Sequence, residues 1–147
     1  MTRRYAEGTD VPVDRSRGEI TGILATHGVQ RMGWTTSPEG DELGFELAGG
    51  TFRFTIRKPT LEDVRAAAEA DGKDLRYILN WSAKVDAEWR RRWRANVLLL
   101  KAKLEFIDAG DTTIDRELLA YRVLNDGRTL EQALAEGRLP LLATDRP

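Results

Sequence analysis

Residues 42–57 read ELGFELAGGTFRFTIR and decide the fold of this chain of 147 residues. On each side of Gly49-Gly50, apolar and polar residues alternate with the period of two that is typical of a half-buried strand. Two adjacent glycines favour a two-residue hairpin turn, so we predict an antiparallel hairpin that turns at Gly49-Gly50. The predicted register pairs Leu47 with Phe52, Phe45 with Phe54 and Leu43 with Ile56 on one face, and Glu46 with Arg53 and Glu42 with Arg57 on the other.

The residues before the hairpin extend it to a third strand. A four-residue loop at Ser37–Gly40 keeps the apolar residues on one face and brings opposite charges together on the other. We therefore predict a three-stranded antiparallel meander that is packed on its apolar face by helices. In this register Met32 faces Phe45, Trp34 faces Leu43 and Arg31 faces Glu46.

A first helix is predicted over residues 17–27. Ser16 and Glu19 have the three-residue spacing of a capping box at its start. Gly28 stands where a left-handed residue ends a helix, and Val29 then closes a Schellman motif. The sheet is therefore preceded by one amphipathic helix.

A long helix is predicted after the sheet. Thr60 caps a short helix that runs to about residue 70, and the long helix starts between Asp74 and Ser82 and ends before Gly110. At about 28 residues it measures ~42 Å, so we expect part of it to project or to pair with another chain. Its apolar stripe is Ile78, Trp81, Val85, Trp89, Trp93, Val97, Leu100, Leu104 and Ile107.

Two short helices are expected in the C-terminal third. The first starts at Thr112 or Thr113, and Thr129 and Gln132 form a capping box for the second. The fold class is therefore α+β: an N-terminal helix, a three-stranded antiparallel meander, a long helix and two short C-terminal helices. We expect a flexible arm over 1–15 and a single domain over 16–147, in which Leu139, Leu141 and Leu142 of the C-terminal tail pack against the body.

The composition excludes several classes of site. There is no cysteine, and the N-terminus lacks the apolar stretch of a secretory signal, so we expect a cytoplasmic protein. His27, the one histidine, lies at a helix end, where a structural role is favoured over a catalytic one. The acidic residues Asp108, Asp111, Asp115 and Glu117 do not have the spacing of a calcium loop. We therefore predict no catalytic, cofactor or metal site, and no enzymatic activity.

The segment from Lys84 to Lys103 is strongly basic. It carries seven Lys or Arg against Asp86 and Glu88, a net charge of about +5, so the rest of the chain carries about −6. One interpretation is a ridge that contacts nucleic-acid phosphates. The other is an amphipathic helix whose arginines pair with acids elsewhere in the fold, and this one is favoured. The candidate nucleic-acid-binding residues are Arg90, Arg91, Arg94 and Lys101.

Leu98 and Leu99 lie off the apolar stripe of the long helix. The helix is therefore apolar nearly all round at this point, and another element or another subunit must cover it. We take Leu98 and Leu99 as candidate interface residues of a homodimer.

Three blocks of sequence carry a resemblance: YAEGTDVPVDRSRGEI (5–20), RRRWRANVLLLKAKLEFIDAG (90–110) and TTIDRELLAYRVLNDGRT (112–129). They resemble a family of small uncharacterised proteins encoded by bacteriophages and prophages. The resemblance implies a phage origin and the host cytoplasm, and it implies no activity. Because the sequence indicates no active site and the long helix is over-long and locally over-apolar, we expect a non-enzymatic phage accessory protein that binds a host or phage protein, or itself. The alternative is a nucleic-acid-binding protein that uses the basic helix, and a third class, an enzyme with an unfamiliar site or a binder of small nucleotides, stays open.

Overall fold

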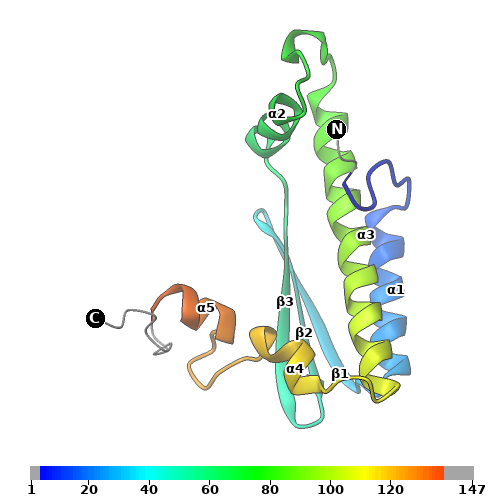
Figure 1. The fold of residues 1–147 in the computed structure, drawn as a ribbon, viewed down its shortest axis with the longest axis vertical. Helices are drawn as coiled ribbons and strands as arrows, with labels where there is room; N and C mark the ends of the chain where they lie inside the picture. Colours follow the sequence, from blue (N-terminus) through cyan, green and yellow to red (C-terminus); the bar gives the residue numbers. More distant parts are fainter. Residues whose placement is uncertain (1–3, 138–147) are drawn as a thin grey trace.

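A computed structural model of the chain describes residues 4–137. Its elements follow one another in the order helix, three strands, then helices (Figure 1). The sheet forms one layer, and α1 (Val13–Thr26) and α3 (Trp81–Asp108) lie side by side as a second layer against it. The α+β fold predicted from the sequence is therefore confirmed.

The sheet is an antiparallel meander of β1 (Arg31–Ser37), β2 (Gly40–Leu47) and β3 (Gly50–Arg57), in the order β1-β2-β3. The predicted pairing of the first two strands is confirmed, with Met32 opposite Phe45, Trp34 opposite Leu43 and Arg31 opposite Glu46.

The predicted pairing of β2 with β3 is wrong by two residues. The two-residue turn is Ala48-Gly49, and Phe45 therefore lies opposite Phe52, Leu43 opposite Phe54 and Glu46 opposite Thr51. Gly50 is instead the buried first residue of β3, and a Cβ atom there would lie 3.0 Å from the ring of Phe52. A shift of two keeps each side chain on its face, so the core is as predicted while the Glu46–Arg53 and Glu42–Arg57 pairs do not form.

Helix α1 begins earlier than predicted. Pro12 is its N-cap residue, and Ser16 is a buried residue inside the helix, so the predicted capping box of Ser16 with Glu19 is wrong. Proline fixes the extended conformation before the first turn without needing a donor partner. The C-terminal end is as predicted: Gly28 has φ +89°, and the N–H of Val29 donates to the carbonyl of Leu24 at 3.0 Å.

Helix α3 and its neighbours define the rest of the core. The part of α3 from Trp93 to Leu104 packs with α1 over the sheet, and Trp93 is fully buried. Its N-terminal part extends beyond the sheet, where α2 (Leu61–Ala70) lies beside it and the short 3-10 helix η1 (Leu75–Tyr77) leads into it (Figure 1). As predicted, Thr60 caps α2.

The C-terminal third contains α4 (Ile114–Leu118), the 3-10 helix η2 (Leu119–Tyr121) and α5 (Leu130–Ala135). The two α-helices start after Thr113 and Thr129, as predicted. The sequence did not predict a short addition to the sheet, in which Val123 donates from its N–H to the carbonyl of Thr51 at 2.8 Å. The predicted packing of Leu139, Leu141 and Leu142 lies outside the described residues. None of the helices in the described range 4–137 combines the length and the apolar character that a membrane-spanning segment needs.

Candidate functional site

The four basic residues that were candidates for phosphate contacts lie on two different sides of α3. Arg94 donates to the carboxylate of Glu19 on α1 at 2.6 Å, and Arg91 donates to Glu88 within α3. Lys101 is exposed, and Arg90 is half-buried. Two of the four candidate residues, Arg91 and Arg94, therefore pair with acids, as the structural interpretation expects.

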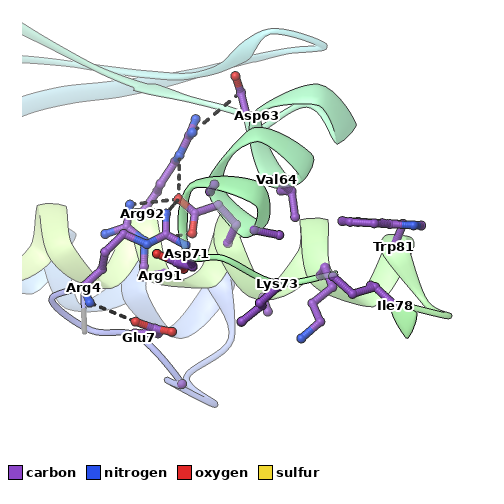
Figure 2. A pocket seen from close by; sticks show the side chains of 16 residues that line it. Arg4, Glu7, Asp63, Val64, Asp71, Lys73, Ile78, Trp81, Arg91 and Arg92 are labelled. Atoms are coloured by element: carbon purple, nitrogen blue, oxygen red, sulfur yellow. Dashed lines mark hydrogen bonds and ion pairs between the residues drawn. The ribbon is translucent and has the colours of Figure 1, made fainter. Parts of the chain in front are cut away.

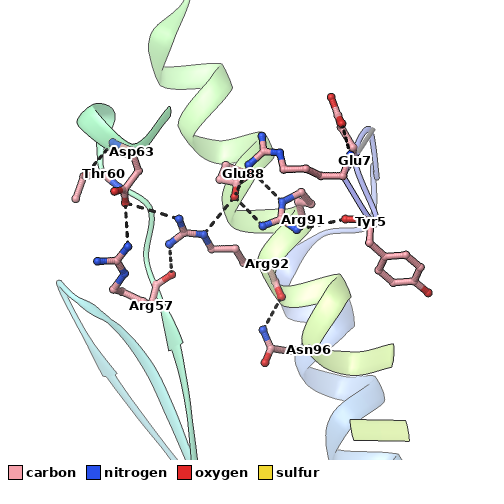
Figure 3. A network of polar contacts seen from close by, with 10 residues as sticks. Tyr5, Glu7, Arg57, Thr60, Asp63, Glu88, Arg91, Arg92 and Asn96 are labelled. Carbon is pink, nitrogen blue, oxygen red and sulfur yellow. Dashed lines mark hydrogen bonds and ion pairs between the residues drawn. The ribbon is translucent and has the colours of Figure 1, made fainter. Parts of the chain in front are cut away.

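Glu88 is the centre of the polar network on the N-terminal half of α3 (Figure 3). Its side chain is 8% exposed, and it accepts hydrogen bonds from Arg91 at 2.9 Å, from Arg92 at 3.3 Å and from Arg4 at 3.3 Å. Arg91 also donates to the carbonyl of Tyr5 at 3.3 Å. One carboxylate therefore fastens the N-terminal segment to α3.

The same network reaches α2 and the sheet. Arg92 donates to the carbonyl of Arg57 at 2.9 Å and lies 3.7 Å from the carboxylate of Asp63. Asp63 is also the third residue of the capping box of α2, where it accepts from the N–H of Thr60. This chain of contacts ties four segments together at the point where α3 leaves the sheet.

Glu88 remains ionised in this network. Burial alone would raise the pKa of its carboxyl, but the hydrogen bonds and charge of Arg91, together with the charge of Arg4, hold the pKa below its ordinary value. A buried carboxylate with several guanidinium partners is more strongly held than an exposed ion pair.

A second, partly buried charge pair lies between α1 and the sheet. The guanidinium of Arg17 lies 5.6 Å from the ring centre of Trp34 and 5.2 Å from that of Trp93, and it donates to the nearly buried Asp41 at 2.9 Å. The two tryptophan rings are 5.1 Å apart. Sequence reasoning missed this cluster, because nothing in the local pattern of Arg17 or Asp41 indicates a partner in a distant element.

A cleft of about 310 Å³ lies beside Glu88 (Figure 2). Its walls are α2, the N-terminal part of α3 and residues 4–8 of the N-terminal segment. The apolar part of the lining consists of small or branched side chains together with one tryptophan: Val64, Ala67, Ala68, Ile78, Trp81 and Ala87. Its charged part is Arg4, Lys73, Lys84, Arg91 and Arg92 with Glu7, Asp63, Asp71 and Glu88.

The two candidate interface leucines have different surroundings. Leu98 is half-buried and lines a groove between α1 and α3 together with Ile23 and Gly22. Leu99 is 43% exposed and lies on the side of α3 that points away from the core, as does Phe106, which is 56% exposed. The first helix thus covers Leu98 in part, while Leu99 keeps an exposed face.

His27, for which the sequence favours a structural role, contacts the carboxylate of Asp108 at the C-terminal end of α3. This pair joins the ends of α1 and α3. Within the described range 4–137, no group of three or more His, Cys, Asp or Glu side chains is arranged to hold a metal ion.

Comparison with known proteins gives no match to a family model, to a curated protein or to a solved structure. The resemblance to phage and prophage proteins therefore rests on the three sequence blocks alone, and function must be argued from the geometry.

Proposed function

We propose that this protein acts by binding other macromolecules, and that its first partner is a second copy of itself. The observation that supports this is a second apolar face on α3. Four residues at helical spacing form it, and we name them the outer stripe: Ala95, Leu99, Ala102 and Phe106.

The outer stripe continues a face that is already used for packing. Further towards the N-terminus, the same side of α3 carries Glu88 and Arg92, which contact the N-terminal segment, Asp63 and the end of β3. Beyond Arg92 this cover stops, and Leu99 and Phe106 are 43% and 56% exposed. Leu99 and Phe106 lie two turns apart on the same side of α3, with Ala102 between them, and this continuous apolar stripe supports a contact surface.

The sizes of these side chains fit an antiparallel pair of α3 helices. If a two-fold axis passes midway between positions 100 and 101, Phe106 faces Ala95 of the second copy and Leu99 faces its Ala102. Large residues then oppose small ones at all four positions, as close helix packing requires. The uncovered half of α3 would meet the same half of the other helix, which is the isologous arrangement of a two-fold dimer.

The expected dimer is a modest one. A single pair of helices buries less than the roughly 800 Å² per partner of a standard interface, so the dimer should dissociate in the micromolar range. Such a dimer leaves the N-terminal part of α3, with α2, available for a further partner. A phage accessory protein that binds a host or phage protein is the role that fits this arrangement and the resemblance described above.

Engineered cysteines test the proposal, because the chain has none of its own. Mixing the variants Leu99→Cys and Ala102→Cys under mild oxidation should give a cross-linked heterodimer faster than either variant alone. A matched control is Leu79→Cys, since Leu79 is 93% exposed but lies outside α3. Equal cross-linking of all three cysteines would reject the antiparallel register.

Nucleic-acid binding by the basic helix is the alternative proposal. The ion pairs of Arg91 with Glu88 and of Arg94 with Glu19 count against it, because a phosphate would have to compete with these carboxylates. Lys101 is exposed and makes no ion pair within residues 4–137, but a few separate cations supply little affinity for a phosphate backbone.

A further inference from the structure

The cleft beside Glu88 has the form of a small-molecule site. Its volume of about 310 Å³ lies at the lower end of the range for such sites. The space exists because α2 presents alanines to it: Ala67 and Ala68 leave room that longer side chains would fill. Figure 2 shows Val64, Ile78 and Trp81 along one end of this space.

The charges around the cleft favour an anion. Five of its lining side chains are cationic and four are carboxylates. Three of the carboxylates are already engaged: Glu88 by three arginines, Asp63 by Arg92 and Arg57, and Glu7 by the backbone N–H of Arg4. A cationic ligand would therefore find these carboxylates occupied.

Two cations on the rim are available to a ligand. Lys73 and Lys84 line the cleft, and neither makes an ion pair or a side-chain hydrogen bond with any residue from 4 to 137. Arg4 and Arg91 also line the cleft, where they share the carboxylate of Glu88 with Arg92, and the charge of Glu7 acts on Arg91 as well. Charge-assisted hydrogen bonds from such donors are the strong contacts that orient an anionic group.

We propose that the cleft between α2, α3 and the N-terminal segment binds a small organic anion. Its carboxylate, sulfonate or phosphate group lies between Lys84, Lys73 and Arg91, and its apolar or aromatic body lies against Val64, Ala67 and Trp81. This site is independent of the outer stripe, and a ligand in it would bridge the N-terminal segment and α2.

The test is calorimetric titration with three compounds that separate the two parts of the site. 2-Naphthalenesulfonate has both a charge and an aromatic body, 2-naphthalenemethanol has only the body, and inorganic phosphate has only the charge. We expect sub-millimolar binding of the sulfonate, and binding weaker by about tenfold or more for each of the other two. Naphthalene-2-carboxylate should bind like the sulfonate if the site recognises charge, and a phosphate monoester should be preferred if it recognises phosphate.

Three variants locate the binding. Lys73→Ala with Lys84→Ala should weaken sulfonate binding about tenfold, and Ala67→Leu should abolish it by filling the cleft without a change of charge. The control Lys101→Ala removes another exposed lysine of α3, the helix that contains Lys84, and should leave binding of the sulfonate unchanged. Unfolding curves establish that each variant is folded. The proposal is overturned if the folded wild-type protein does not bind the sulfonate, or if Ala67→Leu binds it as well as wild type does.

Discussion

The backbone at Gly40 leaves no room for a side chain. A Cβ atom there would lie 2.3 Å from the carbonyl oxygen of Ile56, and φ is +148°. Gly40→Ala should therefore lower the free energy of unfolding by at least about 2–3 kcal/mol, as measured by denaturant titration. The control is Gly44→Ala, because a Cβ at Gly44 meets only the carbonyl of Phe52, at 4.0 Å. Equal stability of the two variants would show that the β1–β2 turn differs from the one described.

At Ala48 we expect the opposite effect, a gain in stability when the residue is replaced by glycine. Ala48 has φ +49° in the turn between β2 and β3, a conformation that costs a residue with a Cβ roughly 1 kcal/mol. Ala48→Gly should therefore raise the free energy of unfolding by about 0.5–1 kcal/mol. Ala25→Gly, on an exposed side of α1, should lower it by about the same amount. A destabilised Ala48→Gly variant would mean that the hairpin turns elsewhere.

These two residues also show where sequence reasoning stops. The alternation of apolar residues predicted the core face of all three strands, and that face is correct. The turn was misplaced because Gly49-Gly50 is the better turn sequence by itself, whereas in the structure Gly50 pairs with Leu47, Phe45 lies opposite Phe52, and the ring of Phe52 leaves no room for a side chain at Gly50. Register in a hairpin depends on such side-chain packing, which local patterns do not contain.

The elements around Glu88 are held together by charge, so their stability should depend on pH. The folded-state pKa of Glu88 lies below its ordinary value near 4.5. Its contribution is therefore present above that value, and is lost as the pH falls through the lower pKa of the folded state. In Glu88→Gln the free energy of unfolding should be lower at pH 7, and the loss between pH 5 and pH 3, about where carboxylates titrate, should be shallower.

Asp86→Asn is the control for this measurement, because Asp86 is exposed and makes no ion pair within residues 4–137. It should keep the acid dependence of the wild-type protein. Equal acid dependence of Glu88→Gln and wild type would contradict the role given to Glu88.

The basic face of α3 carries a further prediction. Replacing Arg90, Arg94 and Lys101 by Gln should lower the free energy of unfolding by about 1 kcal/mol, since Arg94 loses its half-buried partner Glu19. Lys101→Gln alone should have no effect. Gel-shift and anisotropy assays at physiological salt should find no binding of duplex or single-stranded nucleic acid by the wild-type protein or by the triple variant. Binding that the triple variant abolishes with its fold intact would support the nucleic-acid alternative.

Element order and most helix ends could be predicted from local signals. Thr60, Thr113 and Thr129 cap the helices that follow them, and Gly28 ends α1. The start of α1 could not, because Ser16 looks like a cap in sequence and is buried in the fold. The Glu88 network and the cleft join segments far apart in the chain, so no spacing in the sequence indicates them.

At the scale of the whole molecule, α3 packs against other elements on two of its sides. Its inner side completes the core with α1 and the sheet, and the first part of its outer side is covered by α2 and the N-terminal segment. The sequence predicted that a helix of this length either projects or pairs with another chain. In the structure α3 does extend past the sheet (Figure 1), and the proposed dimer would cover what α2 leaves exposed.

The mass of the protein in solution tests this account most directly. Light scattering across a concentration series, up to about 200 µM, should show the mass rise from 16.6 kDa towards twice that value. The double variant Leu99→Glu, Phe106→Glu should stay at the monomer mass with its helical content unchanged, while Leu79→Glu should dimerise like wild type. A wild-type mass that stays at 16.6 kDa over the whole series would contradict self-association through the outer stripe.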